Sequence, residues 1–433
     1  MAHQPQFKKT VFENGLTVLS EQLDQFRSLS LGVWVKVGTR HETPSVAGVS
    51  HFLEHMLFKG TKTRSALQIA LEVDEVGGEF NAFTAREHTC FHLFLLDRDY
   101  DLGLEILSDV LLNSHFKQSE IDRERRVILQ EIAMVEESPE ELAHDLFFEH
   151  VYGNQGLGQS ILGTEKSVCA MKRSDITGFF NRHYRPNQLI LSVAGNVSHQ
   201  QVLRKIKPLT QKSWPGRNRG VSSRAPHALV GKSSPQFYRG SWWVERPTEQ
   251  VHLIWGVPGP CYSSSDRFAA FLLNIYLGGG MSSSLFQEIR EKHGLAYTVY
   301  SSLSPFMDSG VFSIYAATGI SQVALCLRLI EQSVEKIKKI PLTKEELRVM
   351  SDNLKSSILL SSDCVESRMS SIARNDLFLG RYYSLDEICQ LIDQVTPADL
   401  QRVANQLFQD SKRSILALGP KPNQALRKLF LGM

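Results

Sequence analysis

Hydrophobic and polar positions along the first half of the chain follow two different periods. Short runs rich in β-branched and aromatic residues, bounded by Gly or Asn, predict strands at 14–23, 28–38 and 183–197, and two strands around a tight turn within 80–96. Apolar positions at helical spacing predict helices at 45–60 and 100–113, and a helical tract at 119–151 that is broken near Pro139. For the first helix, Ser45 and Ser50 are the candidate N-caps, and Gly60 marks its end.

The same order of patterns recurs in the second half of the chain. "TEQVHLIWGVPG" repeats the second strand, "RFAAFLLNIYLGGG" takes the place of the first helix, and "RSILALGP" parallels "LILSVAGN". We therefore predict an α+β fold of two homologous α/β sandwich halves, each a mostly antiparallel sheet with helices packed on one face. The predicted domains are 1–212 and 237–433. A linker rich in Ser, Gly, Pro and Arg is predicted at 213–236.

Composition changes this picture little. The chain of 433 residues is 42% hydrophobic and 22% charged, with a formal net charge of +2, which favours a soluble globular protein and gives no sign of nucleic-acid binding. Its six cysteines form no C-x-x-C pair, so a disulfide scaffold is not expected. No secretory signal and no apolar run of membrane-spanning length is seen. We expect a cytoplasmic bacterial protein, or else the mature form of a mitochondrial matrix protein.

The helix at 45–60 contains "HFLEH", with two histidines and a glutamate inside five residues of an apolar run. His51 and His55 are four apart, so they share a helix face and suit Zn²⁺, which prefers N or O ligands in a tetrahedron. Glu54 lies beside them as a candidate general base for a metal-activated water. The alternative is a polar patch on a core helix. The second half lacks these residues, so the chemistry is predicted in the first half.

"HFLEHMLFKGT", followed about 76 residues later by "E-x6-E" in a helix, resembles the inverted zinc peptidases of the pitrilysin family, and most of all the branch of mitochondrial processing peptidase. The resemblance implies that Glu131 completes the zinc site as the third ligand, with one zinc ion per chain. It also implies that Glu124 is an acidic partner beside the site rather than a ligand. The alternative for both residues is an ordinary acidic helix face.

The resemblance extends over most of the chain. "GGEFNAFT" is similar to the family's edge strand, to which substrate adds as an extra β-strand, with Asn81 and Ala82 as contact positions. "GGGMSSSLFQEIREKHGLAYTVYS" is similar to a motif of the family's second half. There, Arg290 and Tyr297 match a pair that holds the substrate backbone and stabilises the oxyanion. The alternatives are a plain strand, a surface arginine and a core tyrosine.

Two further acidic residues match by spacing a site that receives a substrate arginine in processing peptidases. They are Glu141 and Asp145, four residues apart on a predicted helix. A solvated acidic surface is the alternative, because Glu136, Glu137 and Glu140 lie close by.

The resulting hypothesis is a zinc endopeptidase that cleaves peptides or unstructured, presequence-like segments. The resemblance implies a homodimer or a heterodimer with a related chain, because two such chains are needed to close a chamber. The competing hypothesis is a non-catalytic core or assembly protein of the same fold.

Overall fold

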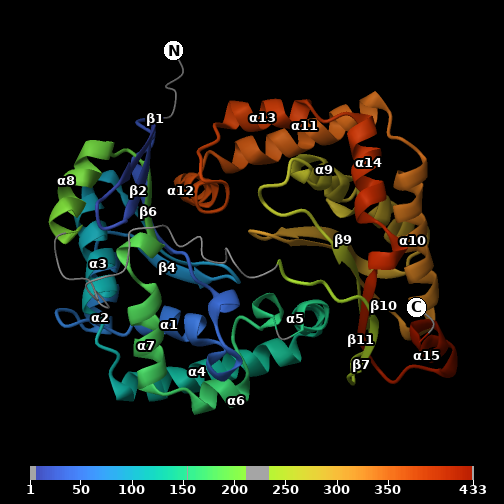
Figure 1. Ribbon diagram of the computed structural model, residues 1–433, viewed down its shortest axis with the longest axis horizontal. Coiled ribbons are helices and arrows are strands. Elements are labelled where there is room, and N and C mark those ends of the chain that lie inside the picture. Colours follow the sequence, from blue (N-terminus) through green and yellow to red (C-terminus); the bar gives the residue numbers. More distant parts are fainter. Residues whose placement is uncertain (1–5, 154, 211–233, 432–433) are drawn as a thin grey trace. The chain divides into compact units, whose positions relative to one another are not determined.

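A computed structural model describes residues 6–153, 155–210 and 234–431. They form two compact units (Figure 1). Unit 1 takes its described residues from Met1–Ala133, Gln159–Ser233 and Ser361–Tyr383, and unit 2 from Met134–Gly158, Ser234–Leu360 and Ser384–Met433. The predicted linker at 213–236 lies almost wholly outside the described residues. No helix in the described ranges is long and apolar enough to cross a membrane.

Unit 1 is built on a six-stranded sheet with the order β1-β2-β6-β3-β5-β4. Its strands are β1 (Gln6–Val11), β2 (Thr17–Gln22), β3 (Ser28–Val35), β4 (Glu79–Thr84), β5 (Thr89–Leu96) and β6 (Leu189–Gly195). Its helices are α1 (Val49–Leu57), α2 (Ala66–Asp74), α3 (Tyr100–Asn113), most of α4 (Gln118–Glu137), α6 (Glu165–Ala170), α7 (Arg173–His183), α8 (His199–Thr210) and α12 (Val365–Arg374).

Unit 2 is built on a five-stranded sheet with the order β7-β11-β8-β10-β9. Its strands are β7 (Ser241–Glu245), β8 (Val251–Pro258), β9 (Ala296–Pro305), β10 (Gly310–Thr318) and β11 (Ser414–Gly419). Its helices are α5 (Pro139–Tyr152), α9 (Arg267–Gly278), the π-helical turn η6 (Phe286–Lys292), α10 (Val323–Lys339), α11 (Lys344–Ser361), α13 (Leu385–Asp393), α14 (Pro397–Leu407) and α15 (Gln424–Leu431).

The two sheets share one topology. In each, a parallel pair (β2 with β6, β7 with β11) is followed by three antiparallel neighbours. Strands β6, β3, β5 and β4 of unit 1 correspond in order to β11, β8, β10 and β9 of unit 2. Helix α9 follows β8 as α1 follows β3. The predicted fold of two similar, mostly antiparallel α+β halves is therefore confirmed.

Strand β3 shows why each sheet needs cover on both faces. Leu29, Leu31 and Val33 point into the main core of unit 1, which α1 and α3 also line. On the opposite face Trp34 donates its indole N–H to Met369 Sδ at 3.3 Å. A Cβ added at Gly32 would lie 2.4 Å from that sulfur, so a larger residue there would have to displace the Met369 side chain of α12.

Each sheet thus receives one helix from the other half of the chain. Helix α12, orange in Figure 1, contacts the strands β2, β3 and β6 of unit 1. Helix α5 packs Ala143, Phe147 and Val151 against the second face of the unit 2 sheet. The predicted division at 213–236 follows chain order, whereas the packing of these two helices crosses it.

Candidate metal centre

Helix α1 is held rigidly because one of its faces is core. Phe52, Leu53 and Met56 are no more than 1% exposed and pack in the main core of unit 1. His51 and His55 lie on another face, with their ring centroids 4.7 Å apart. The apolar residues of "HFLEHMLF" therefore fix the direction in which the two imidazoles point.

Glu131 of α4 completes a triad with these two histidines. Its Oε2 lies 3.6 Å from His51 Nε2 and 3.5 Å from His55 Nε2. Two ligand atoms bound to zinc at 2.0–2.1 Å in a tetrahedron are about 3.4 Å apart. Among the described residues, this is the one group of three or more His, Cys, Asp or Glu side chains with ligand atoms within 4.8 Å of one another.

The protonation of His51 and the hydrogen bonding of Glu131 also fit a bound cation. Glu131 Oε2 is buried and accepts no hydrogen bond within the described part of the chain. Burial, and next the nearby His55, lower the pKa of His51 to about 3. A neutral imidazole and an unsatisfied carboxylate oxygen are the states that a bound metal ion requires.

Glu124 lies beside the triad, as its predicted role implies. Its Oε2 lies 3.1 Å from His55 Nδ1, and its Oε1 forms an ion pair with Lys59 Nζ at 2.8 Å. Burial opposes ionisation of Glu124, but the hydrogen bonds from His55 and Lys59 outweigh it and lower the pKa of the carboxyl. An ionised Glu124 favours the His55 tautomer that carries its proton on Nδ1, which leaves Nε2 free to bind metal.

Replacing Glu124 by Ala is expected to weaken zinc binding about 10- to 100-fold, because His55 loses the acceptor that orients its ring. Competition against a chelating dye measures the change. Glu120→Ala, one turn earlier on the same helix, is the control and should leave the zinc affinity unchanged. Equal affinities for the Glu124 and Glu120 variants would contradict the role given to Glu124.

Glu54 projects from the same helix as the two histidines. Burial raises the pKa of its carboxyl, and a hydrogen bond from Thr84 opposes the rise. Thr84 Oγ1 donates to Glu54 Oε2 at 2.5 Å. A partly desolvated carboxylate next to a metal centre can accept a proton from water and return it to a leaving group.

The N-terminus of α1 is capped differently from the prediction. Neither Ser45 nor Ser50 is the N-cap: Ser45 lies in a preceding 3₁₀ turn and Ser50 is already helical. The N-cap is Gly48, whose left-handed φ of 89° favours glycine. The Glu42 carboxylate accepts the N–H groups of Gly48 and Ser50, both at 2.7 Å. The side chain of Glu42, a buried acid that precedes the helix, thus takes the place of an N-cap side chain.

Glu42 should make the stability of unit 1 depend on pH. Burial raises its pKa from 4.5 to about 7, against the hydrogen bonds from Ser50 and Gly48. Between these values the unfolded chain loses the proton that the folded protein keeps, so stability falls as pH rises, by up to about 3 kcal/mol. Denaturation at pH 5 and pH 7.5 should show a smaller loss in Glu42→Gln than in the wild type. The same loss in both proteins would contradict this assignment.

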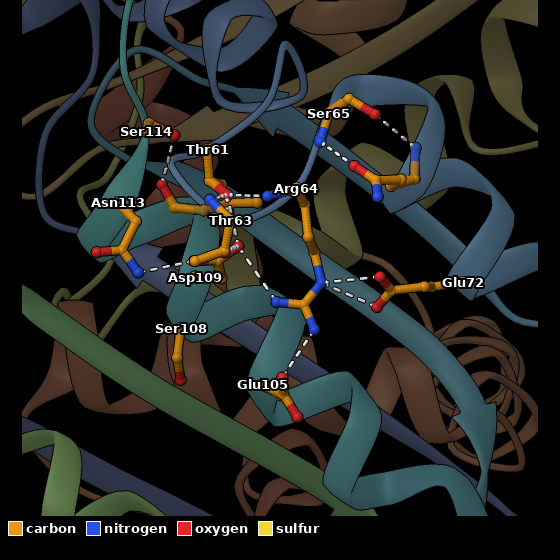
Figure 2. A network of polar contacts seen from close by, with 12 residues as sticks. Thr61, Thr63, Arg64, Ser65, Glu72, Glu105, Ser108, Asp109, Asn113 and Ser114 are labelled. Atoms are coloured by element: carbon orange, nitrogen blue, oxygen red, sulfur yellow. Dashed lines mark hydrogen bonds and ion pairs between the residues drawn. The ribbon is translucent and has the colours of Figure 1, made fainter.

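A polar network fixes the loop that follows α1 (Figure 2). The buried Asp109 of α3 accepts hydrogen bonds from the hydroxyls of Thr61 and Thr63, at 2.6 and 2.7 Å. Arg64 pairs with Asp109 and also with Glu72 and Glu105. The chain is therefore held on both sides of α1, the helix that carries His51 and His55.

The predicted substrate-contact residues lie on β4, an edge strand of the unit 1 sheet. Asn81 and Ala82 alternate in direction, as strand residues do. The Asn81 Oδ1 accepts the N–H of Ala82 at 2.8 Å. The ring of Phe80 contacts that of Phe58 at a tilt of 46°, with ring centroids 4.5 Å apart, so one face of β4 points toward the end of α1.

The remaining predicted site residues belong to unit 2. Arg290 donates to the carbonyl oxygen of Tyr297 at 3.1 Å, and its guanidinium lies 4.4 Å from that ring. Tyr297 is 76% exposed, so it is not the core tyrosine of the alternative interpretation. Glu141 and Asp145 lie on α5. Their predicted functions at the metal centre stay predictions.

Three residues around the triad were missed from sequence: Glu42, Lys59 and Thr84. Lys59 had a signal, because it lies one helical turn after His55 in "HMLFK". Glu42 and Thr84 reach α1 from a loop and a strand, and no periodic pattern marks such contacts.

Known protein families and curated relatives match this chain over most of its length. Residues 17–165 match a family described as insulinase (peptidase family M16), and residues 170–354 match the peptidase M16 inactive domain. A protein of Streptomyces coelicolor described as an uncharacterized zinc protease is 39% identical over 97% of this chain and 91% of its own length. An uncharacterized zinc protease of Bacillus subtilis is 37% identical over 93% of this chain and 95% of its own length.

Two solved structures have the same fold. A protease from Helicobacter pylori aligns with a TM-score of 0.87 and 24% identity, over 96% of this chain and all of its own. A structure from Pseudomonas fluorescens, titled as a peptidase M16 inactive domain, aligns with a TM-score of 0.87 and 19% identity, over 96% of this chain and 99% of its own. At these identities the likeness concerns the fold.

Proposed function

The chain belongs to the M16, or insulinase, family of peptidases, and on this premise we propose that it is a zinc-dependent endopeptidase that cleaves peptides or unstructured segments. The observation that carries the proposal is the triad of His51, His55 and Glu131, in which Glu131 Oε2 lies at tetrahedral spacing from both imidazoles, with Glu54 beside them. Relatives described as zinc proteases over nearly the whole length of the chain support it.

In this proposal His51, His55 and Glu131 hold one zinc ion. The ion, when bound, would polarise the scissile carbonyl and acidify water. Glu54 takes a proton from the attacking water and later gives it to the leaving amine. Arg290 and Tyr297 hold the substrate backbone and stabilise the oxyanion.

Substrate is proposed to add to the free edge of β4. An edge strand presents unpaired N–H and C=O groups that recognise extended backbone, so unfolded peptides are favoured over folded proteins. The N–H of Ala82 is satisfied by the Asn81 side chain, which an incoming strand would displace. Glu141 and Asp145 are proposed to receive a basic side chain of the substrate, and a self-dimer or a dimer with a related chain is proposed for the assembly.

The test is zinc analysis combined with digestion of a mixed peptide library read by mass spectrometry. We expect about one zinc per chain, cleavage of the peptides, loss of cleavage with a chelator and its recovery when zinc is added back. Folded globular proteins should stay uncut. A chain that takes up no zinc and leaves the library uncut would instead be a non-catalytic core or assembly protein of this fold.

A further inference from the structure

Thr84 makes a contact with Glu54 that the family resemblance does not account for. Thr84 is the last residue of β4, and its hydroxyl donates to Glu54 Oε2 at 2.5 Å. In the described part of the chain, this is the one hydrogen bond that the Glu54 carboxylate receives. We propose that Thr84 is a positioning residue that orients the general base Glu54, an inference that rests on the proposed function.

The contact constrains how Glu54 can act. A hydrogen bond on Oε2 fixes the plane of the carboxylate and leaves Oε1 for the proton of the attacking water. A general base must lie within hydrogen-bond reach of that proton, and misplacement by about 1 Å costs about 10²-fold in rate. Without Thr84, the Glu54 carboxylate loses the one hydrogen bond that it receives from the described part of the chain.

Thr84 is itself held by the turn that follows it. Ala85 donates its N–H to the carbonyl of His88 at 2.8 Å and so closes the β4–β5 turn. The N–H of Arg40 donates to the carbonyl of Arg86, and the Arg40 guanidinium pairs with Glu87 at 2.5 Å. The side chains of this ion pair are only 8% and 3% exposed, so water has little access to the charged groups that hold the turn in place.

The segment at 38–42 packs against both elements that carry the Thr84–Glu54 hydrogen bond. Its first residue, Gly38, lies so close to the turn that an added Cβ would be 2.1 Å from the carbonyl oxygen of Ala85. Its last residue, Glu42, caps the helix that carries Glu54. One segment therefore sets the position of α1 and of the end of β4, which explains how a single hydroxyl can stay aligned with the base.

Thr84 also belongs to the strand to which substrate is proposed to add. Ala82 and Thr84 point to the same face of β4, because they are two residues apart. A peptide bound along β4 would lie against the strand that orients the base. The placement of substrate and the orientation of Glu54 therefore share one rigid element.

The test compares Thr84→Val, which keeps the shape but removes the donor, with Thr84→Ser, which keeps the donor. We expect Val to lower kcat about 10- to 100-fold, with KM and zinc affinity within about twofold of the wild type, and Ser to restore most of the rate. A purely structural role would instead lower the melting temperature and leave kcat unchanged in the folded fraction.

A double variant separates this inference from the proposed function. If Thr84 acts through Glu54, Thr84→Val should have no further effect in a Glu54→Gln background. Native kcat in Thr84→Val, or equal losses in the Val and Ser variants, would overturn the inference while leaving the peptidase intact. If Thr84→Val does not fold, Thr84→Ala is compared with Thr84→Ser in the same way. An inactive wild type would instead refute the proposed function.

Discussion

Replacing Glu54 by Gln is expected to lower kcat for peptide cleavage about 10²- to 10⁴-fold, with the zinc content unchanged. Gln has the same shape, and its amide oxygen still accepts the Thr84 hydroxyl, but it cannot take a proton from water. The substitution leaves all three candidate ligands, His51, His55 and Glu131, in the chain, so the zinc content is expected to stay the same. Steady-state kinetics on a peptide found in the library digest, together with zinc analysis, measure both quantities.

Glu75→Gln is the matched control, since Glu75 is an exposed acid just beyond α2. It should retain native kcat, KM and zinc content. Native activity in Glu54→Gln would remove Glu54 from the mechanism. Loss of zinc in that variant would show that Glu54 supports metal binding rather than proton transfer.

Replacing Arg368 by Ala is expected to lower the free energy of unfolding of unit 1 by about 3–5 kcal/mol. Arg368 of α12 makes a bidentate ion pair with Glu21 of β2, and their side chains are 6% and 0% exposed. Tyr382 also donates to this carboxylate, at 2.8 Å. Removing the guanidinium leaves the Glu21 charge buried without its cation, and that uncompensated charge is the main cost. Urea denaturation at constant pH measures the change.

Arg402 provides the control for this prediction. It pairs with Asp266 in unit 2, where the side chains are 46% and 29% exposed. Arg402→Ala should cost less than about 1 kcal/mol, because water already solvates both charges. A Glu21→Leu, Arg368→Met double variant should recover much of the stability lost in Arg368→Ala, since no buried charge is left unpaired. Equal losses for Arg368→Ala and Arg402→Ala would show that the buried ion pair contributes no more to stability than the exposed one.

Much of the fold could be predicted because it follows from local periodicity. The spacing of apolar residues predicted the strands of the first half, the helix break near Pro139 and the recurrence of the same order in the second half. The structure has these features at the predicted places. The sequence did not predict that α5 and α12 each pack on the sheet formed by the other half of the chain. Each helix is simply amphipathic in sequence, and an apolar stripe does not say which sheet it covers.

The candidate site divides in the same way. His51, Glu54 and His55 are one helical turn, so their proximity followed from the 3.6-residue period alone. Glu131 was reached by family resemblance, and the structure brings its carboxylate to the two imidazoles. Arg290 and Tyr297 were predicted as a pair, and the structure places them in contact with each other.

By itself, the sequence determined the two-half architecture and the helix that carries the histidines, and it predicted a metal site on that helix. Only the tertiary structure decided which side chains surround that helix. Glu42 caps its N-terminus, Thr84 donates a hydrogen bond to Glu54, and Lys59 forms an ion pair with Glu124. It alone placed Arg368 on Glu21, 347 residues away along the chain. The physical reason is that periodicity records which face of an element is buried. Which polar groups meet across two elements depends on how the whole chain packs.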